Sequence, residues 1–362
     1  MSKPKVVVGM SGGVDSSVAA HILKEQGYEV IGITMQIWGQ TAPEDDSGGC
    51  CGISAVEDAR RVCHQLGIPH YVMNFRDDFE KYVIDYFLDE YQQGRTPNPC
   101  IACNRYVKWE SMLQKSLQLG AEYIATGHYA RIRKDEKTGR YTLAQSATQA
   151  KDQTYALYNL TQHQLAHTLM PLGDYTKEEI RQIAKEIDLL VADKPDSQEI
   201  CFVPDDDYGK FITENTDTQS KEGNFIDQKG NILGKHKGII HYTIGQRKGL
   251  GIQAAKPLYV TKINPETNEV TVGDNKDVFQ SKVYANKLNF MPFDRLEGEM
   301  TLTGKIRYSQ KAAPCTVEMI DEDTMLCTFH EPQRAVTPGQ ALVLYDGDAV
   351  VGGGTILGTV NN

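Results

Sequence analysis

Short apolar runs alternate with amphipathic segments over the first half of the chain. Four apolar runs, bounded by glycine or polar residues as buried strands are, span 5–9, 30–35, 70–74 and 123–126. Apolar residues at helical spacing fill the segments between and after them, at 16–26, 54–66, 79–93 and 106–119, and residues 161–188 are mostly helical. Strands that alternate with helices predict an α/β fold with a doubly wound parallel sheet.

The pattern changes after about residue 205. Glycines and short alternating segments take over, and no long helical pattern remains. From about residue 278 the expected strands span 302–308, 315–320, 325–329, 341–345 and 350–357. Such a series of short strands with turns between them predicts a small β-barrel.

The charge balance argues against a generic nucleic-acid binder, because the 362 residues carry 38 Lys and Arg against 48 Asp and Glu, a net charge of −10. Residues 228–265 reverse this locally, with several basic residues, no acidic residue, and aromatic side chains such as Tyr242 and Tyr259. This stretch fits either a polyanion or a solvated surface with no partner. No apolar run approaches the ~18 residues of a membrane span and the first residues do not form a signal peptide, so we expect a cytoplasmic protein with no membrane partner.

The loop between the first predicted strand and the first predicted helix has the composition of a phosphate-binding turn. It reads GMSGGVDSS over residues 9–17. Its glycines allow close approach, and backbone N–H groups at a helix N-terminus bind anions. Asp15 suits a Mg²⁺ ligand or an organiser of the loop better than a direct phosphate contact. The loop contains neither the Walker Gly-Lys-Ser/Thr nor the dinucleotide G-x-G-x-x-G, and a plain glycine turn is the alternative.

Eight cysteines are too few for a disulfide scaffold in a chain of this length. Cys100 and Cys103 lie in a C-x-x-C segment that follows two prolines and precedes a predicted helix. A thiol at a helix N-terminus beside Arg105 and Lys108 should have a lowered pKa and act as a nucleophile, and half of a structural metal site is the alternative. Cys201 lies in a polar loop between the α/β part and the β part.

The remaining cysteines have weaker signals. Cys63 lies on the apolar side of a predicted helix, and Cys315 and Cys327 lie in predicted barrel strands, so all three are expected to pack in cores. Cys50 and Cys51 are adjacent in a glycine-rich segment, and the sequence suggests for them only a gating or redox role.

The motif SGGVDS directly after a VVVG strand resembles the PP-loop of the ATP pyrophosphatase superfamily. The resemblance implies an adenine nucleotide alpha hydrolase-like fold that uses ATP and Mg²⁺, cleaves ATP to AMP and pyrophosphate, and thereby adenylates a carbonyl oxygen. It implies that ATP is bound by Gly9, Met10, Ser11, Gly12, Gly13, Val14, Asp15, Ser16, Met35 and Gly127.

Further motifs extend the resemblance from Val6 to about Gly358, among them ATGHYAR, KDQTYALY, DSQEICF, HYTIGQRKGLGI and VTPGQALVLY. With these the chain resembles the tRNA-specific 2-thiouridylase (MnmA/TrmU) family, which replaces the C2 oxygen of the wobble uridine of tRNA with sulfur. The resemblance implies a PP-loop domain at 1–205, a small central β-rich domain at 206–277 and a C-terminal β-barrel domain at 278–362. It also implies two partners, tRNA and a sulfur donor protein, either a cysteine desulfurase or a sulfur relay protein.

The resemblance implies a role for particular residues. Cys201 would hold a persulfide, and Cys103 would be the nucleophile that releases its sulfur by forming a disulfide with Cys201. The target base would face Asn98, Pro99 and Cys100, and tRNA would contact Lys151, Asp152, Gln153, Arg307 and Tyr308. The barrel sequence supports the last contacts independently, because Lys305, Arg307, Ser309 and Lys311 alternate and predict a basic strand face.

One departure from the family leaves the sulfur chemistry open. Many members have Asp where this chain has Cys100. Cys100, Cys103 and Cys201 together could hold a [4Fe–4S] cluster that delivers sulfide, as in related PP-loop tRNA thiolases. Persulfide relay and cluster chemistry therefore compete. Another PP-loop ATP pyrophosphatase ligase and a non-enzymatic nucleotide-binding regulator remain the other functional alternatives.

Overall fold

The computed structural model describes residues 3–37, 53–195, 200–203, 207–216 and 220–359. Cys50 and Cys51 lie outside these residues. The chain divides into two compact units. The first comprises residues 1–83, 100–206 and 348–350, and the second comprises residues 84–99, 207–347 and 351–362.

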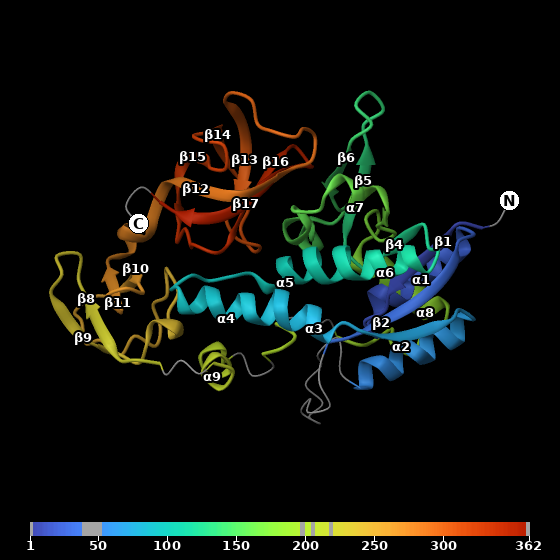
Figure 1. The fold of residues 1–362 in the computed structure, drawn as a ribbon, viewed down its shortest axis with the longest axis horizontal. Coiled ribbons are helices and arrows are strands. Elements are labelled where there is room, and N and C mark those ends of the chain that lie inside the picture. Colours follow the sequence, from blue (N-terminus) through green and yellow to red (C-terminus); the bar gives the residue numbers. More distant parts are fainter. Residues whose placement is uncertain (1–2, 38–52, 196–199, 204–206, 217–219, 360–362) are drawn as a thin grey trace. The chain divides into compact units, whose positions relative to one another are not determined.

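The first unit is built on a parallel sheet of five strands in the order β3-β2-β1-β4-β7 (Figure 1). The strands are β1 (Lys5–Gly9), β2 (Glu29–Gln36), β3 (His70–Asn74), β4 (Tyr123–Ala125) and β7 (Thr168–Leu169). The four predicted strands are confirmed to within about one residue. The short β7 was not predicted, because its two residues lie inside a segment with a helical pattern.

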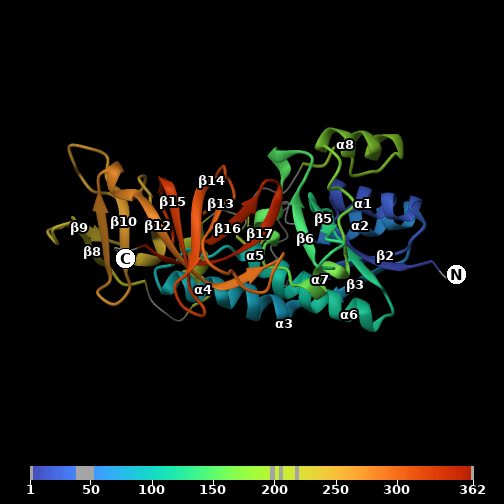
Figure 2. The same ribbon diagram turned by 90° about the horizontal axis from the view of Figure 1, so that it is seen from above.

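Helices cover both faces of this sheet. The helices α1 (Val14–Glu25), α2 (Ile53–Leu66) and α8 (Lys177–Glu186) lie on one side of it, and α6 (Leu113–Gln118) packs against β4 on the other (Figure 2). Alternate residues of β1 explain this, since Val6 and Val8 belong to the core that includes α1, α2 and α8. A strand buried on both faces is apolar throughout, as the VVV run of β1 is.

This half of the chain contains further helices and strands outside the sheet. They include two π-helical segments, η1 (Glu80–Ile84) and η2 (Cys103–Met112), which continue α3 (Arg76–Phe79) and α5 (Pro99–Ala102). The predicted helices at 79–93 and 106–119 are thus confirmed, but the second begins earlier, at Pro99. Proline is favoured in the first turn of a helix, where its missing N–H costs nothing. The rest are α4 (Asp85–Gln92), β5 (Ala130–Lys134), β6 (Tyr141–Gln145), η3 (Gln149–Lys151), η4 (Thr154–Leu157) and α7 (Gln162–Ala166).

The second unit contains a small sheet with the strand order β10-β11-β8-β9. Its strands are β8 (Gly223–Ile226), β9 (Ile232–His236), β10 (Tyr259–Asn264) and β11 (Glu269–Gly273). Three short helices accompany it, namely α9 (Tyr208–Glu214), η5 (Ile239–His241) and η6 (Asn275–Val278). This is the central β-rich part that the change of pattern after residue 205 predicted.

The last strands form a closed barrel. The order β12-β15-β14-β13-β16-β17 is closed by pairing of β12 with β17. The strands are β12 (Phe279–Phe290), β13 (Met300–Lys305), β14 (Ala313–Met319), β15 (Met325–Arg334), β16 (Ala341–Asp346) and β17 (Ala349–Gly358). Closure leaves the barrel without an exposed edge strand, and the predicted C-terminal barrel is confirmed.

The predicted basic strand face at residues 305–311 is wrong. Strand β13 ends at Lys305, and residues 306–310 form a turn. Ile306 is 1% exposed and packs in the barrel core. The Arg307 guanidinium donates hydrogen bonds to the carbonyl oxygens of Arg334 and Ala335, the first at 3.2 Å. These contacts bend the chain out of the strand direction, so the side chains that follow do not alternate across a sheet.

Among the helices that the structure describes, none combines the length and the apolar character needed to span a bilayer.

Candidate active site

A cavity of about 240 Å³ lies at the carboxyl ends of β1 and β4. The chain places β2 and β3 on one side of β1 and places β4 and β7 on the other, so this is the point at which the order of the sheet reverses. Open α/β sheets bind their ligands in the crevice at such a point. Of the ten residues expected to bind ATP, those that line the cavity are Gly9, Met10, Ser11, Asp15, Ser16, Met35 and Gly127, whereas Gly12, Gly13 and Val14 do not.

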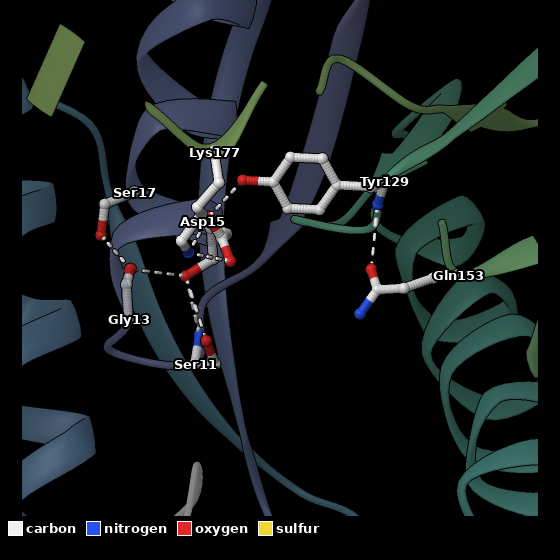
Figure 3. Close-up of polar contacts among 8 residues, drawn as sticks. Ser11, Gly13, Asp15, Ser17, Tyr129, Gln153 and Lys177 are labelled. Atoms are coloured by element: carbon white, nitrogen blue, oxygen red, sulfur yellow. Dashed lines mark hydrogen bonds and ion pairs between the residues drawn. The ribbon is translucent and has the colours of Figure 1, made fainter. Parts of the chain in front are cut away.

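Serine hydroxyls hold the loop of residues 9–17 in shape (Figure 3). Ser16 Oγ accepts a hydrogen bond from the Ser11 N–H at 3.2 Å and donates one to the Gly13 carbonyl at 3.2 Å. Ser17 Oγ donates to the same carbonyl at 2.8 Å. Gly13 precedes α1 and offers no side chain to cap it. The N–H groups of the first turn of α1 are therefore available to an anion.

The loop is also fixed against α2. Gly12 has φ +70°, and a Cβ atom there would lie 2.3 Å from the Ala55 carbonyl oxygen. Only glycine fits this conformation and this approach. The Lys194 ammonium joins the two segments from outside, since it donates to the Gly12 carbonyl at 3.2 Å and to Asp58 Oδ2 at 2.7 Å.

Asp15 is bound from two sides by groups that are distant in the sequence. The ammonium of Lys177, a residue that is 6% exposed, contacts Asp15 Oδ1 at 2.7 Å and Oδ2 at 2.8 Å. The Tyr129 hydroxyl donates to Asp15 Oδ1 at 2.8 Å (Figure 3). Of the two roles expected for Asp15, this arrangement supports the organiser of the loop.

The described residues offer no ready metal site. No group of three or more His, Cys, Asp or Glu side chains among residues 3–37, 53–195, 200–203, 207–216 and 220–359 is placed to hold a metal ion. Both carboxylate oxygens of Asp15 already accept hydrogen bonds from Lys177. The described residues therefore present no preformed site for a protein-held Mg²⁺ or a three-cysteine cluster, and we derive no step through either.

The opposite wall of the cavity carries Lys108 and His128. The Lys108 ammonium donates to Asn104 Oδ1 at 2.9 Å, and the Thr126 hydroxyl contacts His128 Nδ1 at 2.7 Å. Burial and the neighbouring Lys108 ammonium hold the pKa of His128 well below its ordinary value. The imidazole is therefore neutral, and Lys108 supplies the positive charge of this wall.

Sequence reasoning missed several of these groups. Thr126 and His128 follow β4 directly, and polar residues at the carboxyl end of a parallel strand are a usable signal for a site. Lys177 offers no such signal. It lies 162 positions from Asp15, and only the packing of α8 against α1 brings the two together.

Cys103 is the first residue of η2, the segment that also carries Lys108 and Met112 to the cavity wall. Because the helical run begins at Pro99, Cys103 lies inside it rather than in the preceding loop. Cys103 is half-buried and Cys100 is exposed.

The Cys201 segment is anchored in the core by its neighbours. Phe202 and Val203 are 3% and 0% exposed, whereas Cys201 is half-buried. The Phe202 ring makes an edge contact with Phe79, with centroids 5.8 Å apart. The backbone that carries Cys201 is thus anchored to α3 through its neighbour Phe202.

The helical segment of residues 76–84, which contains α3 and η1, also contacts η2, the segment that begins at Cys103. Tyr82 follows Phe79 by about one turn and stacks on Tyr106 of η2 at 5.1 Å between ring centroids. Residues three apart on a helix share a face. The segment 76–84 therefore contacts both cysteine-bearing segments, although Cys103 and Cys201 are far apart in the sequence.

The other described cysteines pack in cores, as predicted. Cys63, Cys315 and Cys327 are each 0% exposed. Burial raises the pKa of the Cys63 thiol to about 12. All six described cysteines, including Cys103 and Cys201, are thiols in this structure, so the disulfide between Cys103 and Cys201 stays a prediction about turnover.

The residues expected to contact tRNA differ in accessibility. Lys151 is half-buried, and Asp152 is 6% exposed, with its carboxylate accepting hydrogen bonds from the Ser146 N–H at 3.2 Å and the Thr154 hydroxyl at 2.7 Å. Gln153 lines the cavity and accepts a hydrogen bond from the Tyr129 N–H at 2.9 Å.

In the second unit, Tyr308 is 48% exposed and Arg307 is held by backbone carbonyls. Asn98 and Pro99 belong to this unit by their contacts, while Cys100 belongs to the first. Asn98 is half-buried and Pro99 is buried.

Comparison with known proteins covers almost the whole chain. Residues 4–205 match a family model described as the tRNA methyl transferase HUP domain, residues 209–274 one described as the tRNA methyl transferase PRC-barrel domain, and residues 280–356 one described as the aminomethyltransferase beta-barrel domain. The tRNA-specific 2-thiouridylase MnmA of Lachnoclostridium phytofermentans is 63% identical over 98% of this chain and 99% of its own length.

The proteins of the same name from Acetivibrio thermocellus and Clostridioides difficile are similarly close. The first is 63% identical over 98% of this chain and 100% of its own length. The second is 57% identical over 97% of this chain and 98% of its own length. The chain therefore belongs to the tRNA-specific 2-thiouridylase MnmA family.

Proposed function

We propose that this protein is an ATP-dependent tRNA 2-thiouridylase that exchanges the C2 oxygen of the wobble uridine for sulfur. The observation that carries the proposal is the arrangement of η2, which begins at Cys103 and lines the cavity beside the loop of residues 9–17 with Lys108 and Met112. A nucleotide site and a nucleophilic thiol thus share one rigid element. The names of its close relatives support the same reaction.

The first step activates an oxygen that is a poor leaving group. The C2 oxygen of uracil attacks the α-phosphorus of ATP, and the bond from that phosphorus to the bridging oxygen breaks. The electron pair leaves with pyrophosphate, the N3 proton of the uracil passes to solvent, and the uridine now carries AMP at C2. Backbone N–H groups at the start of α1 contribute by holding the phosphates.

The second step delivers the sulfur. A sulfur donor protein, a cysteine desulfurase or a sulfur relay protein, loads Cys201 as a persulfide, and the terminal sulfur attacks C2 while AMP leaves. The Cys103 thiolate then attacks Cys201 Sγ and breaks the S–S bond, so that its electron pair remains on the sulfur at C2. The products are 2-thiouridine and a disulfide between Cys103 and Cys201, which an external thiol must reduce before the next turnover.

Contacts to tRNA come from both units in this proposal. Asn98, Pro99 and Cys100 face the target base, and Lys151, Arg307 and the half-exposed Tyr308 contact the rest of the tRNA. Asp152 and Gln153 do not contact the tRNA directly in this proposal. Their side chains hold Ser146, Thr154 and Tyr129 in place by hydrogen bonds inside the protein. Contacts to phosphate make binding fall as salt concentration rises.

The proposal is tested by incubating the protein with ATP, Mg²⁺, a persulfide source and unmodified tRNA. Nucleoside mass spectrometry should find 2-thiouridine, together with AMP and pyrophosphate in equal amounts. High-resolution masses separate the exchange of oxygen for sulfur from the addition of a methyl group, the reaction named in the descriptions of two matching family models. Release of pyrophosphate without thiolated tRNA would favour another PP-loop ligase, and absence of release would favour a regulator.

Replacing Cys100 with serine separates the two sulfur chemistries. In a relay that needs only Cys103 and Cys201, Cys100→Ser should still form 2-thiouridine and lose at most the contact of Cys100 with the target base, because no sulfur passes through the exposed Cys100 thiol. A [4Fe–4S] cluster held by three cysteines would lose its third ligand and its activity. The measurement is single-turnover thiolation of the anaerobically purified variant together with iron content. Iron in the wild type and inactivity of Cys100→Ser would reverse the choice in favour of the cluster.

A further inference from the structure

The cavity presents one cation whose charge no described carboxylate offsets. Lys177 and Lys194 lie close to the loop of residues 9–17, but their ammonium groups are bound to Asp15 and Asp58 at 2.7 Å. Among the described residues that line the cavity, Lys108 alone is a lysine or arginine. An ATP phosphate chain carries several negative charges. Among these lysines it is therefore attracted most strongly to the one whose charge no carboxylate neutralises.

Lys108 is held by a neutral group. Its ammonium donates to Asn104 Oδ1 at 2.9 Å, and the Asn104 Nδ2 donates to the Ala156 carbonyl at 3.0 Å. The second bond fixes the amide so that its oxygen faces Lys108, and Asn104 is 2% exposed. An amide orients the ammonium and leaves its positive charge intact, whereas a carboxylate at this position would neutralise that charge.

Neither η2 nor the neighbouring His128 neutralises the charge of Lys108. Asn104 and Lys108 both lie on η2, the second about one turn after the first, so the pair is set by a rigid element. His128, which lines the same cavity, has a pKa held well below its ordinary value by burial and by Lys108, and so adds no charge of its own. The positive field inside the cavity therefore comes from Lys108 and from the N-terminus of α1.

We propose that Lys108 is a catalytic residue of the adenylation step, with its ammonium on the phosphate chain of ATP, and that Asn104 is its positioning residue. This inference rests on the proposed function. As the uracil oxygen attacks the α-phosphorus and pyrophosphate departs, negative charge shifts onto oxygens of the phosphate chain, and a preorganised cation stabilises it. No proton is transferred in this role. Because Cys103 precedes Asn104 directly, the same turn of η2 sets the thiol and the cation.

The role of Lys108 is measured by pyrophosphate release in a single turnover at saturating ATP and tRNA. Lys108→Met should lower this rate by about a hundredfold while the dissociation constant for ATP rises only a few-fold, because the charge develops after binding. Lys108→Arg, which keeps the charge, should recover part of the loss. The matched control is Lys115→Met, which removes a lysine farther along the same helical run that donates to the Asn74 carbonyl at 3.1 Å and does not line the cavity.

Asn104 is tested with two substitutions. Asn104→Asp places a carboxylate against Lys108 and should slow pyrophosphate release more than Asn104→Ala, although aspartate is the closer match in shape. If Asn104 served only packing, Asn104→Ala would be the more harmful change. That order of rates, or a Lys108→Met variant as fast as the wild type, would overturn the inference.

Different results would overturn the proposed function and the proposed role of Lys108. Formation of 2-thiouridine by the wild type tests the proposed function, and the ratio of pyrophosphate rates between variants tests the role of Lys108. A wild type that makes 2-thiouridine, beside a Lys108→Met variant of equal speed, leaves the function standing and removes the role of Lys108. A wild type that releases no pyrophosphate with tRNA overturns both.

Discussion

Cys103→Ser and Cys201→Ser are each expected to abolish 2-thiouridine formation, with a loss of at least roughly a thousandfold in single-turnover rate. Serine at position 201 cannot carry a persulfide sulfur. Serine at position 103 cannot break the S–S bond that links the modified base to Cys201. ATP binding and pyrophosphate release should stay within a few-fold of the wild type, because neither thiol lines the cavity. Quantification of nucleosides and pyrophosphate in one reaction measures both effects.

Cys63→Ala is the matched control for the removal of a thiol. Cys63 belongs to the same unit but is 0% exposed in the core between α2 and the sheet. Its thiol, with a pKa raised to about 12, takes no part in thiolate chemistry near neutral pH. The variant should therefore retain thiolation within a few-fold. Full activity of Cys103→Ser or Cys201→Ser beside this control would exclude the persulfide relay.

Gly127→Ala is expected to weaken ATP binding by roughly a hundredfold, equivalent to about 3 kcal/mol. A Cβ atom at Gly127 would lie 2.7 Å from the Ser16 nitrogen and 2.8 Å from the Asp15 carbonyl carbon. Both are backbone atoms at the start of α1, so they cannot swing aside as a side chain would. The methyl group must push the start of α1 away from β4, and calorimetric titration with ATP should measure the loss.

Gly9→Ala provides the contrast on the same cavity. A Cβ atom at Gly9 would meet Met112 and Thr126 side-chain atoms at 3.7 Å, which is ordinary van der Waals contact. This variant should weaken ATP binding less than Gly127→Ala does, because its Cβ atom meets no backbone atom of the protein closer than 3.7 Å. Equal losses of ATP affinity in Gly9→Ala and Gly127→Ala would show that replacing any glycine beside the cavity weakens binding. The close approach of β4 to α1 would then not be the cause.

The sequence was most informative where one local pattern decides the structure. The VVVG run could only be a buried strand, and the serines and glycines that follow it identify the loop before α1. Positions set by tertiary contacts were not predictable. The alternation after Lys305 suggested a longer strand, but burial of Ile306 and the carbonyl contacts of Arg307 turn the chain. A periodic pattern carries no information about such distant partners.

The residues of the candidate site also fall into two groups, those that a local sequence motif reveals and those that only tertiary packing brings to the site. The loop of the site and the two cysteines that we propose to be reactive, Cys103 and Cys201, stand in motifs that can be read from the sequence. Lys177 and Lys194 could not be found in this way, because each acts on the loop only through the packing of distant segments. Lys108 could be seen only as a neighbour of the thiols, since its place in the cavity wall depends on the tertiary packing of η2.

The most direct measurement is peptide mapping under non-reducing conditions after one turnover, with Cys201 preloaded as persulfide and no reductant present. The relay predicts a peptide pair linked through Cys103 and Cys201, in an amount equal to the 2-thiouridine formed. If tRNA became thiolated while both cysteines remained thiols, the sulfur would have come by another route, and the central claim would be wrong.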